Sequence, residues 1–193
     1  MKEDILNTYD KVSNDYGYNS NSLHKLGLDA RKLEEAATNQ ILKVLGLDNY
    51  DVIYTSGNAE SFTMILNNIK NSIYTDNKEI IDICKEKGIN IKTKECIDKN
   101  TFISVKNETF YDGKINHIDI DLNKKYSDLN KYDFITIEDE IPFFGVLIKR
   151  KNIEPENLIN GGKSTTRYRS GTSVTPLIAS FSKLVKLKYK EDK

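Results

Sequence analysis

The stretch Asp51-Val-Ile-Tyr-Thr-Ser-Gly-Asn-Ala-Glu-Ser61 decides the fold, because an apolar run passes through Thr-Ser-Gly directly into a helix-like segment, residues 58–70. Backbone N–H groups at the start of a helix have no partner within the helix, and the helix dipole adds a partial positive charge there. A phosphate could therefore sit over Gly57, Asn58 and Ala59. Strand–Gly–helix junctions are common in α/β proteins, so this stretch alone is a weak signal for a phosphate site.

Helical and strand-like runs alternate along the rest of the chain. Apolar residues recur with the helical period over residues 22–45, and Gly46 follows as a helix stop signal. Further helices are expected over residues 2–9, 60–70, 78–87 and 176–189, and strands over residues 52–54, 72–75, 89–93, 101–105, 118–122, 134–137 and 144–148. The alternation predicts an α/β fold with a mostly parallel sheet flanked by helices. The last two strands are expected to pair antiparallel, because only a short turn joins them.

Length and composition limit the class of protein. A chain of 193 residues with 38% hydrophobic residues and no long linker fits a single domain over residues 1–193. The 29 basic and 29 acidic residues balance, which gives no general case for binding to nucleic acid or to a membrane surface. No apolar run approaches the ~20 residues of a membrane span, and charges stand where a signal peptide would have its apolar segment. We therefore expect a cytoplasmic protein.

Neither cysteine nor carboxylate spacing predicts a metal site. Cys84 and Cys96 lack the paired spacing of a zinc site or a redox motif. Cys84 lies on an apolar helical stripe and is expected in the core. Two lysines near Cys96 could lower the pKa of its thiol, but this alone does not indicate a nucleophile. The acidic run 138–140 could bind a cation, but neighbouring side chains on a strand alternate between faces and cannot all converge.

Two further blocks accompany the turn at Gly57. They are Tyr18-Asn-Ser-Asn-Ser-Leu-His-Lys-Leu-Gly27 and Gly161-Gly-Lys-Ser-Thr-Thr-Arg-Tyr-Arg-Ser-Gly-Thr172. In this order the three blocks resemble the cysteine desulfurases, the class V aminotransferase-like branch of fold type I pyridoxal-phosphate (PLP) enzymes. Those enzymes carry an Asn-Pro-Ser-Ser-x-His-x-x-Gly block, a Thr-Ser-Gly-x-Thr-Glu-Ser phosphate turn and a Gly-Gly-Gly-x-x-x-x-x-Arg-Ser-Gly-Thr segment.

The resemblance implies a trimmed large domain of that fold and a homodimer. In the family, the last Thr of the third block reaches the cofactor phosphate of the neighbouring subunit, and Thr172 stands at that position here. The small C-terminal domain with the sulfur-accepting Cys would begin after residue 190.

The chain departs from the family at the positions that hold the cofactor. Alignment places Glu140 at the Schiff-base Lys, Asn77 at the ring-stacking His and Ala59 at the phosphate-turn Thr. A carboxylate cannot form an imine, and its charge would repel the cofactor phosphate. The segment that supplies the Asp for the pyridine nitrogen is expected to be deleted between about residues 109 and 118.

We therefore expect a catalytically inactive cysteine-desulfurase-like protein without bound PLP, retained as a structural or protein-binding homodimer. The expected remnant of the site is a vestigial phosphate cradle of Gly57, Asn58, Ala59 and Thr172. Two alternatives stay open: a PLP-dependent transferase whose imine Lys is Lys149 or Lys163, and a small-anion binder that uses the cradle. The abundance of Asn, Lys and Ile suggests an AT-rich viral or mobile-element genome, in which case the protein could be virion-associated.

The histidines and two arginines complete the candidates. His24 is expected at a helix start as a structural residue, because no nucleophile is paired with it. His117 is expected in an exposed polar loop. Arg167 and Arg169 could clamp a carboxylate or phosphate, or could hold a surface loop through salt bridges.

Overall fold

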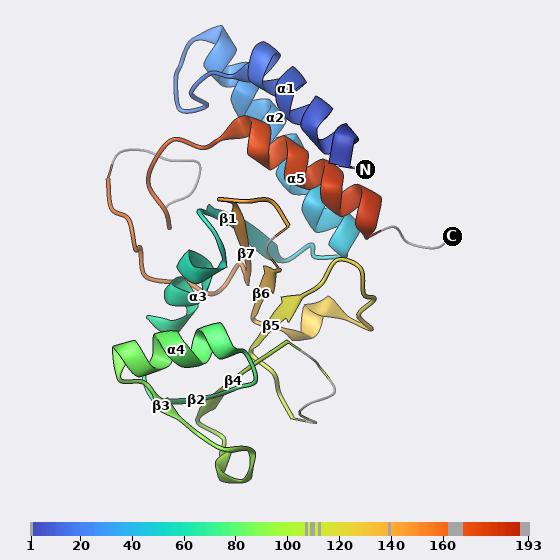
Figure 1. Ribbon diagram of the computed structural model, residues 1–193. Helices are drawn as coiled ribbons and strands as arrows, with labels where there is room; N and C mark the ends of the chain where they lie inside the picture. The colour runs from blue at the N-terminus through green and yellow to red at the C-terminus, as the bar shows by residue number, and fades with distance from the viewer. Residues whose placement is uncertain are drawn as a thin grey trace.

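A seven-stranded sheet forms the centre of the protein in a computed structural model that describes residues 2–106, 108, 111, 113–138, 140–161 and 168–189. The strands follow the order β1-β7-β6-β5-β4-β2-β3 across the sheet (Figure 1). Their bounds are β1 (Tyr50–Thr55), β2 (Ser72–Thr75), β3 (Asn90–Ile91), β4 (Thr101–Val105), β5 (His117–Ile120), β6 (Phe134–Ile137) and β7 (Gly145–Arg150).

All strands except β7 run in one direction. Strands β3, β2, β4, β5 and β6 pair parallel, and β7 pairs antiparallel with both β1 and β6. Because β7 is antiparallel to both β1 and β6, β1 points the same way as β6. The carboxyl ends of β1, β2, β4, β5 and β6 therefore lie at the same edge of the sheet.

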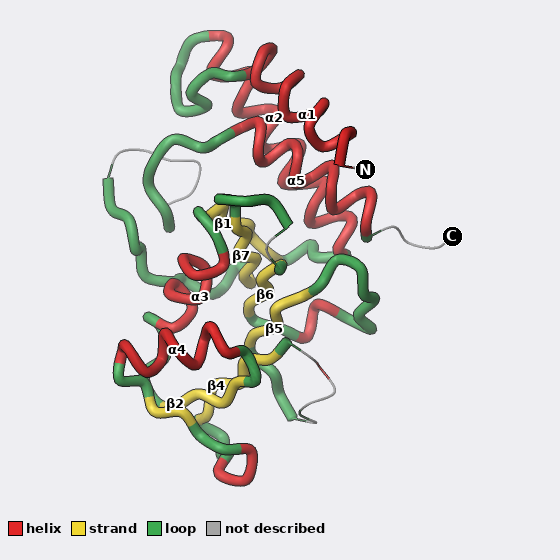
Figure 2. Tube along the Cα trace, in the orientation of Figure 1, coloured by secondary structure: helices red, strands yellow, loops and turns green. Residues whose placement is uncertain are grey.

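Helices cover both faces of the sheet, in two groups that Figure 2 separates clearly. The helices are α1 (Lys2–Tyr16), α2 (Lys25–Leu45), α3 (Asn58–Leu66), α4 (Lys78–Lys87) and α5 (Thr175–Lys188). Helix α5 packs against α1 and α2, whereas α3 packs against α4, β1, β6 and β7. None of the helices that the structure describes has the length and apolar character needed to cross a membrane.

Alternation along the strands divides the core between these two groups. On β1, Val52 belongs to the cluster that includes α2 and α5, whereas Ile53 packs with Met64 and Ile65 of α3. On β7, Val146 and Ile148 share the first cluster and Leu147 the second. Side chains on a strand point to opposite faces in turn, so a sheet covered on both sides buries nearly every strand residue.

The predicted fold class and the antiparallel pairing of the last two strands are confirmed. Strand β2 and helix α4 have the predicted bounds, and α4 ends at Gly88, whose φ of 67° is the left-handed helix stop. Helix α1 runs to residue 16 instead of residue 9. Helix α3 ends at Leu66 instead of residue 70, because Asn68 Nδ2 donates to the Met64 carbonyl at 2.8 Å and competes with further helix.

Gly145, at the start of β7, supports the turn between β1 and α3. A Cβ at this position would lie 2.5 Å from the Gly57 carbonyl carbon and closer still to Thr55 Oγ1. We predict that Gly145→Ala lowers the free energy of unfolding by ~1–3 kcal/mol, because the turn and strand must shift to fit one methyl group. Urea unfolding measures the effect. Gly161→Ala is the matched control, since its Cβ would meet only ordinary contacts with Ser170, and an equal loss in both variants would contradict the prediction.

Candidate functional site

Hydrogen bonds within the chain hold the turn from β1 into α3. The Ser56 N–H donates to Glu60 Oε2 at 2.7 Å, and Arg169 Nε donates to Glu60 Oε1 at 3.1 Å. Thr55 and Ser61 share a hydrogen bond of 2.9 Å between their hydroxyl groups. The Glu60 carboxylate therefore binds the backbone N–H just before the start of α3, whose N-cap residue Gly57 has no side-chain cap hydrogen bond.

Glu60 is ionised at neutral pH. Burial raises the pKa of Glu60, but hydrogen bonds from the backbone and side chain of Ser56 and from Arg169 outweigh it, so the pKa lies below its usual value. An anion approaching Gly57, Asn58 and Ala59 would meet this negative charge at the same turn.

Thr172 lies close to this turn within the same chain. A pocket of about 120 Å³ is lined by Ser56 at the turn, by Phe143 between β6 and β7, and by Thr172. The salt bridge between Glu60 and Arg169 ties the two blocks together inside one subunit. Thr172 and Ser56 thus share a pocket, whereas Gly57, Asn58 and Ala59 are not among its lining residues.

A buried carboxylate stands at the carboxyl edge of the sheet. Asp119 is on β5, and 1% of its side chain is exposed. Thr136 Oγ1, on the paired residue of β6, donates to Asp119 Oδ1 at 2.7 Å. Asn77 Nδ2 lies 3.5 Å from Asp119 Oδ2, and Asn77 Oδ1 caps α4 by accepting from the Glu79 N–H at 3.0 Å.

Lys106 completes this group from the end of β4. Its Nζ lies 3.5 Å from Asp119 Oδ2 and 3.4 Å from Glu138 Oε1, and its backbone N–H donates to Asp76 Oδ1 at 2.8 Å. These residues meet because parallel strands end at one edge, which is where α/β proteins place ligand sites. We call Asn77, Lys106, Asp119 and Glu138 the carboxyl-edge cluster.

The two central charges shift each other's pKa. Burial raises the pKa of Asp119 to about 6, although Thr136 and Lys106 oppose the shift. Burial lowers the pKa of Lys106, but the negative charges of Asp119 and Glu138 more than compensate, so the net shift is upward. Lys106 is therefore a firmly protonated ammonium and a poor nucleophile.

His117 corrects the expectation of an exposed loop. It is fully buried on β5, where Nδ1 contacts Ser104 Oγ at 2.8 Å and Nε2 contacts Thr136 Oγ1 at 3.0 Å. Burial lowers the pKa of His117 to about 3, so the ring is neutral at physiological pH and is part of the packing. The run from His117 to Ile120 alternates polar and apolar residues, which is a strand signal that includes the histidine.

Sequence reasoning also missed Asp119 and Lys106. The segment that supplies the Asp for the pyridine nitrogen was expected to be deleted, yet β5 places a buried carboxylate, Asp119, beside Asn77. A single carboxylate between Ile118 and Ile120, in a strand that begins with His117, was the available signal. The position of Lys106 directly after β4 was the second.

Glu140 and Lys149 serve as ion-pair residues. Both carboxylate oxygens of Glu140 lie 2.7 Å from Lys188 Nζ on α5, and both side chains are mostly buried. The fully buried Lys149 Nζ lies 2.8 Å from Asp51 Oδ2 and 4.5 Å from the Tyr168 ring centroid. Asp51 is four residues before the end of β1, so Lys149 lies roughly 13 Å from the carboxyl edge along the strand.

The other predicted residues have plain structural roles or fall outside the description. His24 caps α2, since its Nδ1 accepts from the Gly27 N–H at 3.2 Å, as predicted. Cys84 is buried in the core, as predicted, and Cys96 is exposed. Asp139, Lys163 and Arg167 lie outside the described residues. Within the described part of the chain, no three His, Cys, Asp or Glu side chains form a group that could hold a metal ion.

Comparison with known proteins establishes the family. The aminotransferase class-V family model matches residues 1–123, well over half of the chain. The chain belongs to the aminotransferase class-V family. It is 25% identical over 222 residues to cysteine desulfurase IscS of Rickettsia akari, covering 87% of this chain and 54% of that protein. A mitosomal cysteine desulfurase of Encephalitozoon cuniculi is 23% identical over 234 residues, covering 92% and 54%.

This family member spans about half the length of the curated relatives it matches. Solved structures share its fold: a NifS-like protein superposes with a TM-score of 0.80 at 21% identity, covering 95% of this chain and 65% of that one. A NifS-like protein from Rickettsia africae gives 0.76 at 19% identity, covering 96% and 65%. The resemblance read from the three sequence blocks is confirmed.

Because the pKa of Asp119 is raised, we predict that the free energy of unfolding depends on pH. The folded protein holds this proton more tightly than the unfolded chain, so stability falls as pH rises from about 4 to about 6. Asp119→Asn removes this dependence on pH. The free energy of unfolding of the variant, relative to that of the native chain, should rise by about 2–3 kcal/mol between pH 4 and pH 7. Urea unfolding at several pH values measures it.

Asp121→Asn is the control for that series. Hydrogen bonding to Asn123 lowers the pKa of Asp121, which places its titration below this pH window. Its stability difference from the native chain should be flat between pH 4 and pH 7. A flat difference for Asp119→Asn would show that the buried carboxylate titrates normally and would contradict the prediction.

Proposed function

We propose that this chain is a catalytically inactive cysteine-desulfurase-like protein that does not hold PLP and works as a self-associating binding protein. The observation that carries the proposal is the Lys106 ammonium, which lies 3.5 Å from Asp119. In the resembled enzymes an Asp pairs with the pyridine nitrogen of the cofactor. We infer that the Lys106 cation stands in for the pyridine nitrogen beside Asp119.

One more group supports the loss of the cofactor. Glu140, aligned with the imine Lys, is engaged by Lys188 and cannot form an imine. The residues present therefore do not fit PLP, which would have to separate two ion pairs and would gain no covalent link.

The same contacts disfavour the two alternative functions, an atypical PLP-dependent transferase and a small-anion binder. Lys149 is far from the carboxyl edge and is held by Asp51, which disfavours it as the imine Lys of an atypical transferase. A small anion at Gly57, Asn58 and Ala59 would lie beside the ionised Glu60 carboxylate, whose negative charge disfavours anion binding.

Borohydride reduction after incubation with PLP tests the loss of the cofactor. We predict no stoichiometric phosphopyridoxyl adduct on any single lysine by peptide mass spectrometry, and no sulfide release from cysteine. The same reaction on unfolded protein is the control for scattered labelling of exposed lysines. One fully labelled lysine in the folded protein only, at Lys106 or elsewhere, would refute the proposal.

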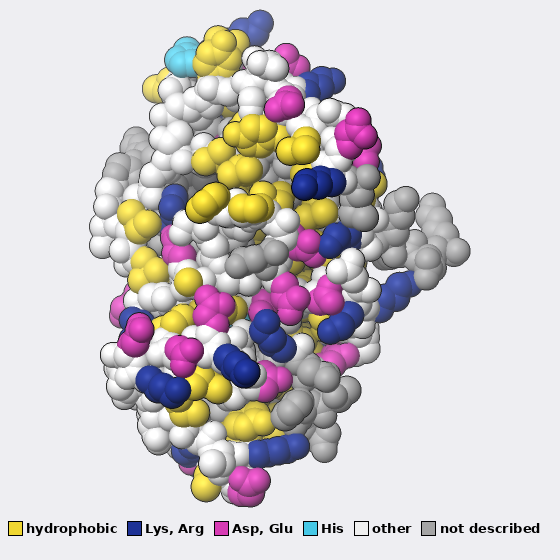
Figure 3. All heavy atoms as spheres, in the orientation of Figure 1, with side chains coloured by type: hydrophobic (Ala, Val, Ile, Leu, Met, Phe, Trp, Pro, Cys, Tyr) yellow, Lys and Arg dark blue, Asp and Glu magenta, His cyan; other side chains and the backbone are white. Residues whose placement is uncertain are grey.

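The part of the proposal that concerns self-association rests on an exposed apolar surface. Phe143 is 91% exposed and Val174 is 48% exposed, and both line the pocket that contains Thr172. Figure 3 shows hydrophobic side chains gathered over α5 and the neighbouring end of β1. Exposed apolar patches mark interaction surfaces. The resemblance also expects the segment with Thr172 at the subunit contact.

We predict a homodimer whose contact includes Phe143. Light scattering at micromolar concentration should give a mass near twice 22.1 kDa, and Phe143→Asn should shift it towards the monomer. Asn suits this position because Phe143 has a φ of 60°, a conformation that Asn adopts more readily than Phe. Leu23→Asn, at an 85% exposed residue before α2, is the control and should leave the mass unchanged. A monomeric native chain would rule out this contact.

A further inference from the structure

Four side chains form a continuous series of hydrogen bonds across the middle of the sheet. Ser104 of β4 lies next to His117 of β5, with 2.8 Å between Oγ and Nδ1. The other ring nitrogen, Nε2, lies 3.0 Å from Thr136 Oγ1 of β6, and Thr136 Oγ1 lies 2.7 Å from Asp119 Oδ1. All four residues are buried. We call Ser104, His117, Thr136 and Asp119 the buried hydrogen-bond series.

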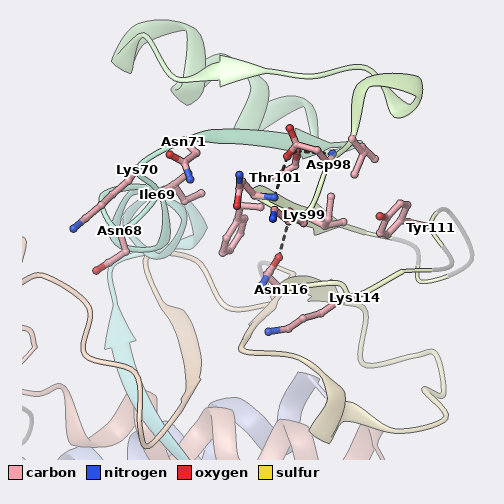
Figure 4. Close-up of a pocket in the computed structure, with 14 residues that line it drawn as sticks. Asn68, Ile69, Lys70, Asn71, Asp98, Lys99, Thr101, Tyr111, Lys114 and Asn116 are labelled. Carbon is pink, nitrogen blue, oxygen red and sulfur yellow. Dashed lines mark hydrogen bonds between the residues drawn. The ribbon is translucent and has the colours of Figure 1, made fainter.

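The backbone holds the His117 ring in this place. The preceding residue, Asn116, lines the cavity that Figure 4 shows. Asn116 Oδ1 accepts from the Ile103 N–H at 3.0 Å, and the Asn116 carbonyl accepts from the Phe134 N–H at 2.9 Å. These bonds join the start of β5 to both neighbouring strands, so they keep the ring between its two hydroxyl partners.

The direction of each hydrogen bond follows from the ionised form of Asp119. An ionised carboxylate only accepts, so the single hydrogen of the Thr136 hydroxyl points to Asp119 Oδ1. The Thr136 oxygen can then only accept from the His117 ring, which places the ring proton on Nε2. Burial lowers the pKa of His117 to about 3, so the ring carries one proton at neutral pH. Nδ1 is therefore unprotonated and accepts from the Ser104 hydroxyl.

A proton on Asp119 would reverse these bonds. Two donors lie near Oδ2, Lys106 Nζ and Asn77 Nδ2, each at 3.5 Å. Oδ1 faces the Thr136 hydroxyl, which can accept, so the added proton belongs on Oδ1. Thr136 then turns its hydrogen to Nε2, and the ring carries its proton on Nδ1 and donates it to Ser104. A ring that kept its proton on Nε2 would leave the Thr136 hydrogen without an acceptor in the series, which is costly in a buried site.

Among the described residues, charged groups surround the Asp119 end of the series. On the side of α3, the His117 ring contacts an uncharged residue, Phe62, edge-on at 5.8 Å between ring centroids. Burial raises the pKa of Asp119 to about 6, so this carboxylate takes up its proton at mildly acidic pH. The titratable groups around Asp119 are Lys106 after β4, Glu138 after β6, Asp76 before α4 and Tyr126 after β5.

From these contacts we infer that the buried hydrogen-bond series is a two-state proton switch: when Asp119 takes up a proton, the neutral His117 ring changes its tautomer from Nε2–H to Nδ1–H. One proton enters from solvent at Asp119 Oδ1. The ring exchanges its proton on Nε2 for one on Nδ1 and stays uncharged, and Ser104 changes from donor to acceptor. The protonation state of the carboxyl edge thereby reaches the interior of the sheet. The inference depends neither on the loss of PLP nor on dimer formation.

Nitrogen-15 NMR of the ring nitrogens tests the inference on the full chain. His24→Asn leaves His117 as the single histidine and keeps a side chain that can cap α2. We expect the proton on Nε2 at about pH 8 and on Nδ1 at about pH 5, with the change centred near the pKa of Asp119, about 6. A ring with the same tautomer at both pH values, or a doubly protonated ring at the lower one, would overturn the inference.

Asp119→Asn tests the coupling without a change of pH. The carbonyl oxygen of the new amide should face the donors Lys106 and Asn77, so its nitrogen donates to Thr136 and the ring stays Nδ1–H at every pH. Thr136→Ser keeps the hydroxyl and should keep the switch. The matched control, Asp121→Asn, removes a carboxylate two residues away and should switch as the native chain does. An Nε2–H ring in Asp119→Asn, or loss of the switch in Asp121→Asn, would contradict the inference.

Discussion

The burial of Asp119 is the constraint on which the arrangement of the carboxyl edge depends. Isolated ionised carboxylates are costly to bury, and they persist where hydrogen bonds and an opposite charge compensate. Thr136 supplies a hydrogen bond from the next strand, and Lys106 supplies the charge from the end of β4. Since Lys106 also reaches Glu138, the ends of β4, β5 and β6 are joined by one set of charges.

The position of β5 in the sheet explains why the Asp119 carboxylate is buried. Ile118 and Ile120 of β5 belong to the core shared with α2 and α5. A strand alternates its faces, so His117 and Asp119 must point to the side of α3 and α4. His117 contacts Phe62 of α3 edge-on at 5.8 Å, which agrees with that side. The polar pair is therefore a consequence of β5 lying in the middle of a sheet covered on both faces.

Local signals made part of the fold predictable. Helix α4 begins after the cap residue Asn77 and ends at Gly88, and both are short-range sequence signals. Lys149 is different, because its partner Asp51 is 98 residues away and only the pairing of β7 with β1 brings them together. Asp119 and Lys106 were missed for a similar reason: their positions at and after a strand are visible in the sequence, but their pairing depends on which strands become neighbours, and local periodicity does not carry that information.

We propose that side chains of the chain itself, with Lys106 beside Asp119, exclude PLP, and that two copies of the chain form a dimer. Native mass spectrometry of the purified protein measures both properties in one experiment. The account predicts a mass near twice 22.1 kDa with no added mass from PLP, even after incubation with the cofactor. A species that carries one PLP per chain and keeps it through buffer exchange would contradict the account.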